Sequence, residues 1–101
     1  MIFDNYFIYI TTNPGKNVLY TGIKNDLYTR MLQHYSNRGL KTTFAGKYFC
    51  YNLIYYERFD NPEDAIHREK EIKGWRRSKK VELINSQNPQ WRSFNGEIKG
   101  G

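Results

Sequence analysis

The residues best suited to chemistry on a phosphate include Arg30 and His34, which lie four positions apart. On a helix this spacing places both side chains on one face, close to the apolar residues Leu27 and Met31. A guanidinium group beside an imidazole can bind a phosphate and move a proton. The alternative is a solvated polar edge of the helix. The pair alone therefore leaves two interpretations open.

Glu69 is an acidic residue in an otherwise apolar part of a predicted helix. At 100° per residue, Ala65, Ile66 and Ile72 define an apolar arc, and Glu69 falls inside it. Charged groups in a core are usually paired, so one interpretation is a glutamate paired with a lysine or arginine at the core edge. The other interpretation is a metal ligand or a catalytic acid.

Two tyrosines, Tyr9 and Tyr20, lie on a predicted β-hairpin. Residues 3–10 and 18–23 have aromatic and β-branched strand patterns, and the residues between them carry turn chemistry. A four-residue loop at 13–16 would place Tyr9 opposite Tyr20 on one face, whereas a different loop length would change this pairing. Each tyrosine taken singly could equally be a core ring.

Caps, prolines and glycines set the limits of the remaining elements. The predicted elements are a helix near 26–37, a basic loop at 39–47, a strand at 48–59, a helix from 61 to about 75, and a short helix capped by Ser78 and ending near 85. The clearest start is Asn61-Pro62-Glu63-Asp64, which combines a cap, a proline at the first helical position and acids in the first turn. This order predicts one α+β domain over residues 1–93 and a flexible tail over 94–101.

Length, charge and cysteine content limit the class of protein. The 101 residues suffice for one domain, and 16 Lys and Arg against 10 Asp and Glu give a net charge of +6. This balance favours polyanionic partners, although a soluble basic surface would look the same. The single Cys50 excludes an internal disulfide and a cysteine-based zinc cluster. Because no signal peptide or long apolar run is present, we expect a cytoplasmic protein without a membrane span.

Together these features resemble the GIY-YIG nucleases. Phe7-Ile8-Tyr9 and Tyr20-Thr21-Gly22 are similar to the two half-motifs that name the family, although phenylalanine replaces the first glycine and threonine replaces the central isoleucine. Residues 20–34 look like the family's second strand and first helix, and residues 65–75 look like its glutamate helix. The likeness extends over residues 3 to about 92 and is greatest to small stand-alone bacterial members related to the nuclease domain of the UvrC repair protein.

The resemblance implies a three-stranded antiparallel sheet flanked by about three helices, in the order β-β-α-β-α-α. It also implies a metal-dependent endonuclease that hydrolyses DNA phosphodiester bonds, in repair or in processing of branched, flap or single-stranded structures. In this family's terms, Tyr9 or Tyr20 would activate a water or position the scissile phosphate, His34 would accept a proton, and Arg30 would stabilise the phosphorane charge.

Glu69 would then hold one divalent cation, Mg²⁺ or Mn²⁺, because a hard cation with few protein oxygens retains waters and takes a substrate phosphate as a further ligand. Many related nucleases also have an asparagine after the glutamate helix. Here Asn85 and Asn88 compete for that role, and the choice between them stays open.

Basic residues define a predicted nucleic-acid surface. Seven of the sixteen Lys and Arg residues lie within positions 68–80, although some of them could serve to cap a helix C-terminus. Trp75 and Trp91 are expected to be packing anchors rather than stacking platforms for bases. The residues assigned to nucleic-acid binding, the first two through the resemblance, are Gly22, Lys41, Lys73, Arg76, Arg77, Lys79 and Lys80.

Two other functions are compatible with the sequence. One is a non-catalytic nucleic-acid-binding module that has kept the fold and the basic surface. The other is an interaction protein whose aromatic surface docks a partner, which an exposed apolar patch would favour. Homodimer formation and a targeting partner are open as well. The presence of the complete set of named polar residues favours the enzyme.

Overall fold

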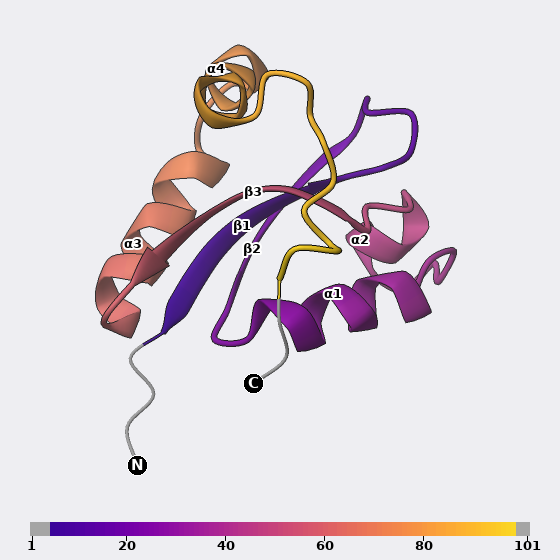
Figure 1. The fold of residues 1–101 in the computed structure, drawn as a ribbon, viewed down its shortest axis with the longest axis horizontal. Helices are drawn as coiled ribbons and strands as arrows, with labels where there is room; N and C mark the ends of the chain where they lie inside the picture. Colours follow the sequence, from indigo (N-terminus) through magenta and orange to yellow (C-terminus); the bar gives the residue numbers. More distant parts are fainter. Residues whose placement is uncertain (1–4, 99–101) are drawn as a thin grey trace.

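The structure is a computed structural model that describes residues 5–98. Figure 1 shows the fold as a ribbon. The described residues form three strands and four helices, in the order β1 (Tyr6–Thr12), β2 (Leu19–Lys24), α1 (Leu27–Ser36), α2 (Phe44–Lys47), β3 (Asn52–Phe59), α3 (Pro62–Lys73) and α4 (Arg77–Gln87).

The strands form one antiparallel sheet in the order β2-β1-β3. The central strand β1 is buried from Ile8 to Thr12, as expected for a strand with neighbours on both sides and helices on both faces. The predicted α+β fold, with a three-stranded antiparallel sheet, is therefore confirmed. The short helix α2 is an addition to the three helices that the sequence predicts.

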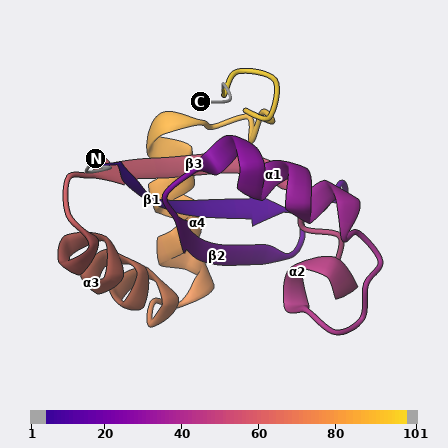
Figure 2. The same cartoon turned by 90° about the horizontal axis from the view of Figure 1, so that it is seen from below.

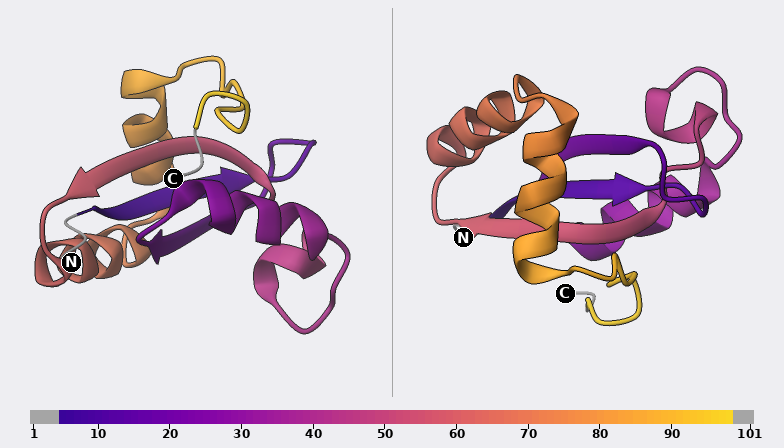
Figure 3. Two further views of the ribbon diagram at one scale, coloured as in Figure 1. Left: turned by 60° about the horizontal axis from the view of Figure 1, so that its bottom comes forward. Right: turned by 90° about the horizontal axis from the view of Figure 1, so that it is seen from above.

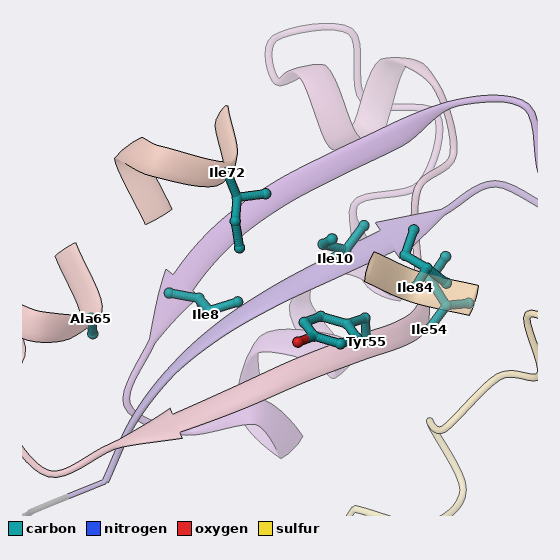
Figure 4. Packing of buried hydrophobic residues seen from close by; sticks show 7 residues of the cluster. All are labelled: Ile8, Ile10, Ile54, Tyr55, Ala65, Ile72 and Ile84. Atoms are coloured by element: carbon teal, nitrogen blue, oxygen red, sulfur yellow. The ribbon is translucent and has the colours of Figure 1, made fainter. Parts of the chain in front are cut away.

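Helices cover both faces of the sheet. On one face α3 and α4 enclose an apolar cluster, shown in Figure 4, and α4 crosses the strands, as the right-hand view of Figure 3 shows. The cluster consists of Ile8, Ile10, Ile54, Tyr55, Ala65, Ile72 and Ile84. On the other face α1 encloses a second cluster of Tyr9, Leu27, Met31 and Leu53. The candidate site residues Tyr9 and His34 belong to this second side.

The β-hairpin has a longer loop than predicted. Asn13 Oδ1 accepts hydrogen bonds from the backbone N–H groups of Asn17 and Val18, both at 3.0 Å, and this side chain closes a loop over residues 13–18. Tyr9 consequently faces Gly22, and Tyr20 faces Thr11, so the predicted pairing of the two tyrosines is wrong. The register differs by two residues, and both tyrosines therefore remain on one face.

Side-chain caps define the starts of two helices. Asp26 accepts a hydrogen bond from Thr29 N at 3.1 Å at the start of α1, and Asn61 accepts one from Asp64 N at 2.9 Å at the start of α3. The predicted cap at Asn61 is confirmed, and Asp26 caps the helix that is predicted to begin near residue 26. The predicted Ser78 cap is wrong, because α4 already begins at Arg77 and lacks a side-chain cap.

The segment before β3 is helical where the sequence predicts a loop. Thr43 caps α2 by accepting a hydrogen bond from Gly46 N at 3.0 Å. After α2 the backbone turns sharply at Phe49, which has a φ of 59°. The strand β3 therefore begins at Asn52, and the predicted start at residue 48 is wrong.

The C-terminal segment lies against the outer edge of β3. Phe94 N donates to Leu53 O at 2.7 Å, and the Asn95 side chain accepts from Leu53 N and donates to Tyr51 O, both at 2.8 Å. Residues 94–98 of the predicted tail thus make defined contacts that cover an edge strand. Residues 99–101, and residues 3 and 4 of the predicted first strand, lie outside the described residues. Within residues 5–98, no helix is long and apolar enough to cross a membrane.

Candidate active site

Three aromatic side chains from three elements meet beside α1. The hydroxyl oxygen of Tyr9 lies 2.8 Å from His34 Nε2, and this hydrogen bond is buried. The ring of Tyr20 lies 6.2 Å from the Tyr9 ring and 5.6 Å from the His34 ring, measured between centroids. The structure therefore brings together both tyrosines of the hairpin and the histidine of α1.

The position of Arg30 and His34 follows from the periodicity of α1. Leu27, Met31 and His34 are buried on the face towards the sheet, and Arg30 is half-buried beside them. This helix face also carries the second apolar cluster, so His34 points into the protein and not into solvent. Arg30 and His34 thus lie on one side of α1, as their spacing of four positions predicts.

The environment keeps both members of the Tyr9–His34 pair uncharged. Burial raises the pKa of Tyr9 well above its usual range, with further contributions from the neighbouring Tyr20 and from the charge of Glu69, while the charge of Arg30 lowers it. Burial and the neighbouring Arg30 charge lower the pKa of His34 to about 4. At neutral pH a single proton is therefore shared between Tyr9 Oη and His34 Nε2.

The buried His34 predicts a specific pH dependence of stability. Because its pKa is depressed in the folded state, the unfolded chain binds more protons as the pH falls from about 6.5 to about 4. The free energy of unfolding should therefore decrease over this range, and the part due to His34 is about 2 to 3 kcal/mol. Denaturant unfolding between pH 7 and pH 4 should show a shallower slope for His34→Gln than for the wild type.

A matched control is available for this measurement. His67 is the other histidine of the chain and is exposed on α3, so His67→Gln should retain the wild-type slope. Equal slopes for the wild type and His34→Gln would contradict the burial of an uncharged His34.

Arg30 carries an unusual unsatisfied group. Its Nε atom is one of two buried side-chain polar atoms without a hydrogen-bond partner among the described residues, the other being Thr11 Oγ1. A buried guanidinium nitrogen without a partner carries a large desolvation penalty. An anionic ligand such as a phosphate would remove this penalty through a charge-assisted hydrogen bond.

Glu69 lies on α3, across the edge strand β2 from α1. Its side chain is only 14% exposed, and its carboxylate accepts from Lys73 Nζ at 3.0 Å. Glu69 is thus paired with a lysine at the edge of the core, which is one of the two interpretations of this residue in the sequence. The same carboxylate also raises the pKa of Tyr9, so its charge acts within the cluster of rings. Contrary to the predicted apolar arc, Ile66 is 43% exposed, whereas Ala65 and Ile72 are buried.

The donor set suits a hard divalent cation held by few protein oxygens. Among residues 5–98, no group of three or more His, Cys, Asp or Glu side chains is placed to hold a metal ion. The single carboxylate of Glu69 could supply one oxygen ligand, with waters and a substrate phosphate completing the shell. Lys73 would have to move aside, and a cation at this place would substitute for its ammonium group.

Gly22 gives Tyr9 the space that it occupies. A Cβ atom on Gly22 would lie 2.5 Å from Tyr9 Cζ, which is well inside contact distance, and Gly22 faces Tyr9 in the register. Gly22 is buried. Its assignment to nucleic-acid binding stays a prediction, and its contact with Tyr9 is the role that the structure indicates.

The two candidate asparagines both have structural partners. Asn88 is buried, and its side chain donates to Ile54 O and Arg92 O, both at 2.9 Å, and accepts from Arg92 N. Asn85 accepts from Trp91 Nε1 at 2.7 Å. Asn88 therefore fastens the segment after α4 to β3, and neither side chain joins the ring cluster in these hydrogen bonds.

Part of the predicted basic surface is engaged within the protein. Lys73 pairs with Glu69, and Lys79 Nζ lies 4.3 Å above the centroid of the Trp75 ring. Trp75 and Trp91 pack against the apolar cluster of Figure 4, as expected for packing anchors. The exposed members of the predicted surface are Lys41, Lys73, Arg76, Arg77 and Lys79, while Lys80 is half-buried.

Sequence reasoning missed two aromatic residues beside the site. Phe44 stacks on Tyr20 with a centroid separation of 6.1 Å, and Tyr48 lies 4.8 Å from Phe44. Phe44 is the first residue of α2 and Tyr48 directly follows this helix, which the sequence does not predict. Their spacing of four positions was the available signal, because it places two rings on one side of a single helical turn.

Comparison with known proteins agrees with this fold. Residues 5–82 match the family model described as the GIY-YIG catalytic domain. This match and the three-stranded antiparallel sheet define a protein of the GIY-YIG class. This chain belongs to the GIY-YIG family.

The similar proteins are small and bacterial. A UPF0213 protein of Staphylococcus saprophyticus is 37% identical over 82 residues, covering 81% of this chain and 96% of the relative. A UPF0213 protein of Staphylococcus aureus is 35% identical over 81 residues, covering 80% and 95%. The solution NMR structure of a UPF0213 protein from Bacillus halodurans is 26% identical, with a TM-score of 0.53, and the likeness covers 86% of this chain and 89% of that one.

Family membership carries a general functional implication. It implies endonuclease chemistry on DNA that depends, as in the family generally, on a divalent metal. The relatives carry only the UPF0213 designation, which states no activity.

Proposed function

We propose that this protein is a metal-dependent endonuclease that hydrolyses DNA phosphodiester bonds, with Tyr9, Tyr20, Arg30, His34 and Glu69 as its active site. The observation that carries the proposal is the buried hydrogen bond between Tyr9 and His34, which are 25 positions apart. A shared proton beside a buried Arg30 Nε atom without a hydrogen-bond partner has no evident structural purpose, whereas hydrolysis of a phosphodiester requires both a proton acceptor and a cation.

The neighbouring side chains of Tyr20, Tyr9 and His34 offer a path for the proton of the attacking water. Tyr20 is half-buried, whereas Tyr9 is buried, so Tyr20 is the hydroxyl that solvent and substrate can reach. In this proposal Tyr20 receives the water proton as it transfers its own to Tyr9, and Tyr9 donates to His34 Nε2. His34 can accept because it is unprotonated at neutral pH.

Arg30 couples phosphate binding to this proton transfer. In the free protein its charge opposes protonation of His34 and lowers the pKa of that ring. A phosphate bound to Arg30 would neutralise this charge and add a negative one, which favours the imidazolium form. Substrate binding thus supports the transfer, and Arg30 remains in place to stabilise the charge that develops on the phosphorane.

Glu69 is the proposed ligand for Mg²⁺ or Mn²⁺. The cation supplies Lewis-acid stabilisation of the phosphoryl oxygens and of the leaving oxygen when it is bound. Its binding would offset the carboxylate charge, which otherwise raises the pKa of Tyr9. Lys73, which holds the carboxylate in the free protein, would be released towards solvent or phosphate.

We propose a cytoplasmic role in repair or processing of DNA structures. The bacterial relatives and the single Cys50, which suits a reducing compartment, support this setting. We also propose that a homodimer or a targeting partner contributes to the choice of substrate.

A cleavage assay tests the enzyme directly. Labelled single-stranded, flap and duplex DNA should be cut with Mg²⁺ or Mn²⁺ and left intact with EDTA. Tyr9→Phe should reduce the rate by about 10²-fold or more, because it interrupts the proton path while keeping the ring. Tyr28→Phe, which changes an exposed tyrosine of α1, should cut like the wild type.

The second candidate is a non-catalytic DNA-binding module. The existing Glu69–Lys73 ion pair favours it, because this pair satisfies the carboxylate without a metal. Salt-sensitive binding to DNA without cleavage of any substrate or with any metal would establish this alternative and exclude the enzyme.

A further inference from the structure

A row of aromatic rings leads from the tyrosines of the site to the surface of α2. Tyr20 stacks on Phe44 at an interplanar angle of 25°, and the next ring, Tyr48, lies 4.8 Å from Phe44. Figure 2 shows α2 beside the start of β2, at the end of the strand opposite α3. We name Tyr20, Phe44 and Tyr48 the aromatic row.

The outer rings of this row are not needed to hold α2 in place. Phe44 is 50% exposed and Tyr48 is 39% exposed. The helix is fixed instead by its small residues, because Ala45 O accepts from Cys50 N and Gly46 O accepts from Gly39 N, both at 2.8 Å. A Cβ atom on Gly46 would lie 2.7 Å from Asn37 O, so this side of α2 is closely packed. The aromatic side faces outwards.

The segment that carries the exposed rings is positively charged. Lys47 Nζ lies 5.3 Å from the centroid of the Tyr48 ring, in a cation–π contact. Residues 37–51 also contain Arg38 and Lys41 and include neither Asp nor Glu. Arg38 covers the ring of Tyr35 at 3.8 Å. Flat apolar rings among cations complement a polyanion that offers flat apolar faces of its own.

We propose that Phe44 and Tyr48 stack unpaired bases of single-stranded DNA next to the scissile phosphate. Bases in a duplex are already stacked and paired, so only an unpaired strand can use these rings. The row starts at Tyr20, and bases stacked on it would therefore place the adjoining phosphate near Tyr20 and Arg30. This inference rests on the proposed function and narrows its substrate to DNA with a single-stranded segment at the cut, such as a flap.

Binding without metal tests the aromatic row independently of cleavage. The probe is an oligo-dT strand containing one 2-aminopurine, whose fluorescence decreases when it stacks. In EDTA the wild type should quench the probe and bind it about 30-fold more tightly than Phe44→Leu/Tyr48→Leu, since each stacked base contributes at least about 1 kcal/mol. Leucine keeps apolar side chains, and Phe44→Trp/Tyr48→Trp should restore both quenching and affinity.

A matched pair on another helix provides the control. Tyr28 and Leu32 are also exposed and four positions apart, on α1, so Tyr28→Ala/Leu32→Ala should bind the probe like the wild type. Affinity for blunt duplex DNA should be the same for all variants that keep the wild-type circular dichroism spectrum and melting temperature. Equal quenching and affinity in the wild type and the leucine variant would overturn the inference.

Two further outcomes separate this inference from the proposed function. If wild-type protein sediments as a dimer that the leucine variant dissociates, with unchanged binding of the probe, the row is a self-association surface and the inference fails. If the row governs binding of the probe but no DNA is cut with any metal, the stacking site stands and the nuclease proposal fails.

Discussion

Replacing Glu69 with glutamine is expected to reduce DNA cleavage by about 10³-fold or more. Metal-ion catalysis contributes several kcal/mol to stabilisation of the transition state, and each 1.36 kcal/mol corresponds to about a tenfold change in rate. Glutamine keeps the size of the side chain, which is only 14% exposed, but removes the charge that a single-carboxylate site requires. Raising the Mg²⁺ concentration should restore little of the rate, because no group of three or more His, Cys, Asp or Glu side chains among residues 5–98 offers another metal site.

Loss of the Lys73 ion pair must be separated from loss of metal binding. Glu71 lies on the same helix and pairs with Arg68 at 2.9 Å, so Glu71→Gln removes a comparable ion pair away from the site. Such pairs contribute only about 0.5 kcal/mol to stability. Both variants should therefore melt close to the wild type, while Mn²⁺ should raise the melting temperature of the wild type and Glu71→Gln alone. Cleavage by Glu69→Gln within tenfold of the wild type would contradict the metal assignment.

The sequence predicts the fold well where a feature depends only on residues within one helix or strand. The caps at Asp26 and Asn61 are short-range hydrogen bonds, and their residue types are visible in the sequence. The helix α2 could not be predicted from the sequence because it has only four residues. It also depends on the close packing of Gly46 against Asn37 O and Leu40 O. Such tertiary contacts leave no periodic signal, and the aromatic residues after α2 have the composition of a strand.

The sequence predicts which side chains share a face at the candidate site, but it does not predict the strand register or the burial of His34. Arg30 and His34 lie on one face because residues four positions apart on a helix project in nearly the same direction. Tyr9 and Tyr20 lie on one face of the sheet because a shift of register by two residues leaves each side chain on the same face. The register itself depends on Asn13, whose side chain closes a longer loop. Burial of His34, and the lowered pKa that follows, come from packing against tyrosines distant in sequence.

Gly22→Ala is expected to destabilise the protein and to reduce cleavage together. The added Cβ would collide with the end of the Tyr9 ring, which is buried among Leu27, Met31 and Leu53 and has little room to move. Overpacking of this kind costs about 1 to 3 kcal/mol. For a chain of this size, each kcal/mol lowers the melting temperature by roughly 4–8 °C. Any displacement of the ring would also move its hydroxyl away from His34 and interrupt the proposed proton path.

A double-mutant cycle can assign this cost to the contact with Tyr9. Tyr9→Leu removes the ring atoms that the new Cβ would meet, so Gly22→Ala should destabilise that background less than it destabilises the wild type. Gly96→Ala is the control, since a Cβ at Gly96 meets no atom within 4 Å, and it should leave the melting temperature unchanged or slightly raised. Equal costs of Gly22→Ala in both backgrounds would show that the glycine is required by the backbone. A reduced cost in the Tyr9→Leu background would show that Gly22 is required by the tyrosine ring, and a parallel loss of cleavage in Gly22→Ala would then be due to displacement of that ring.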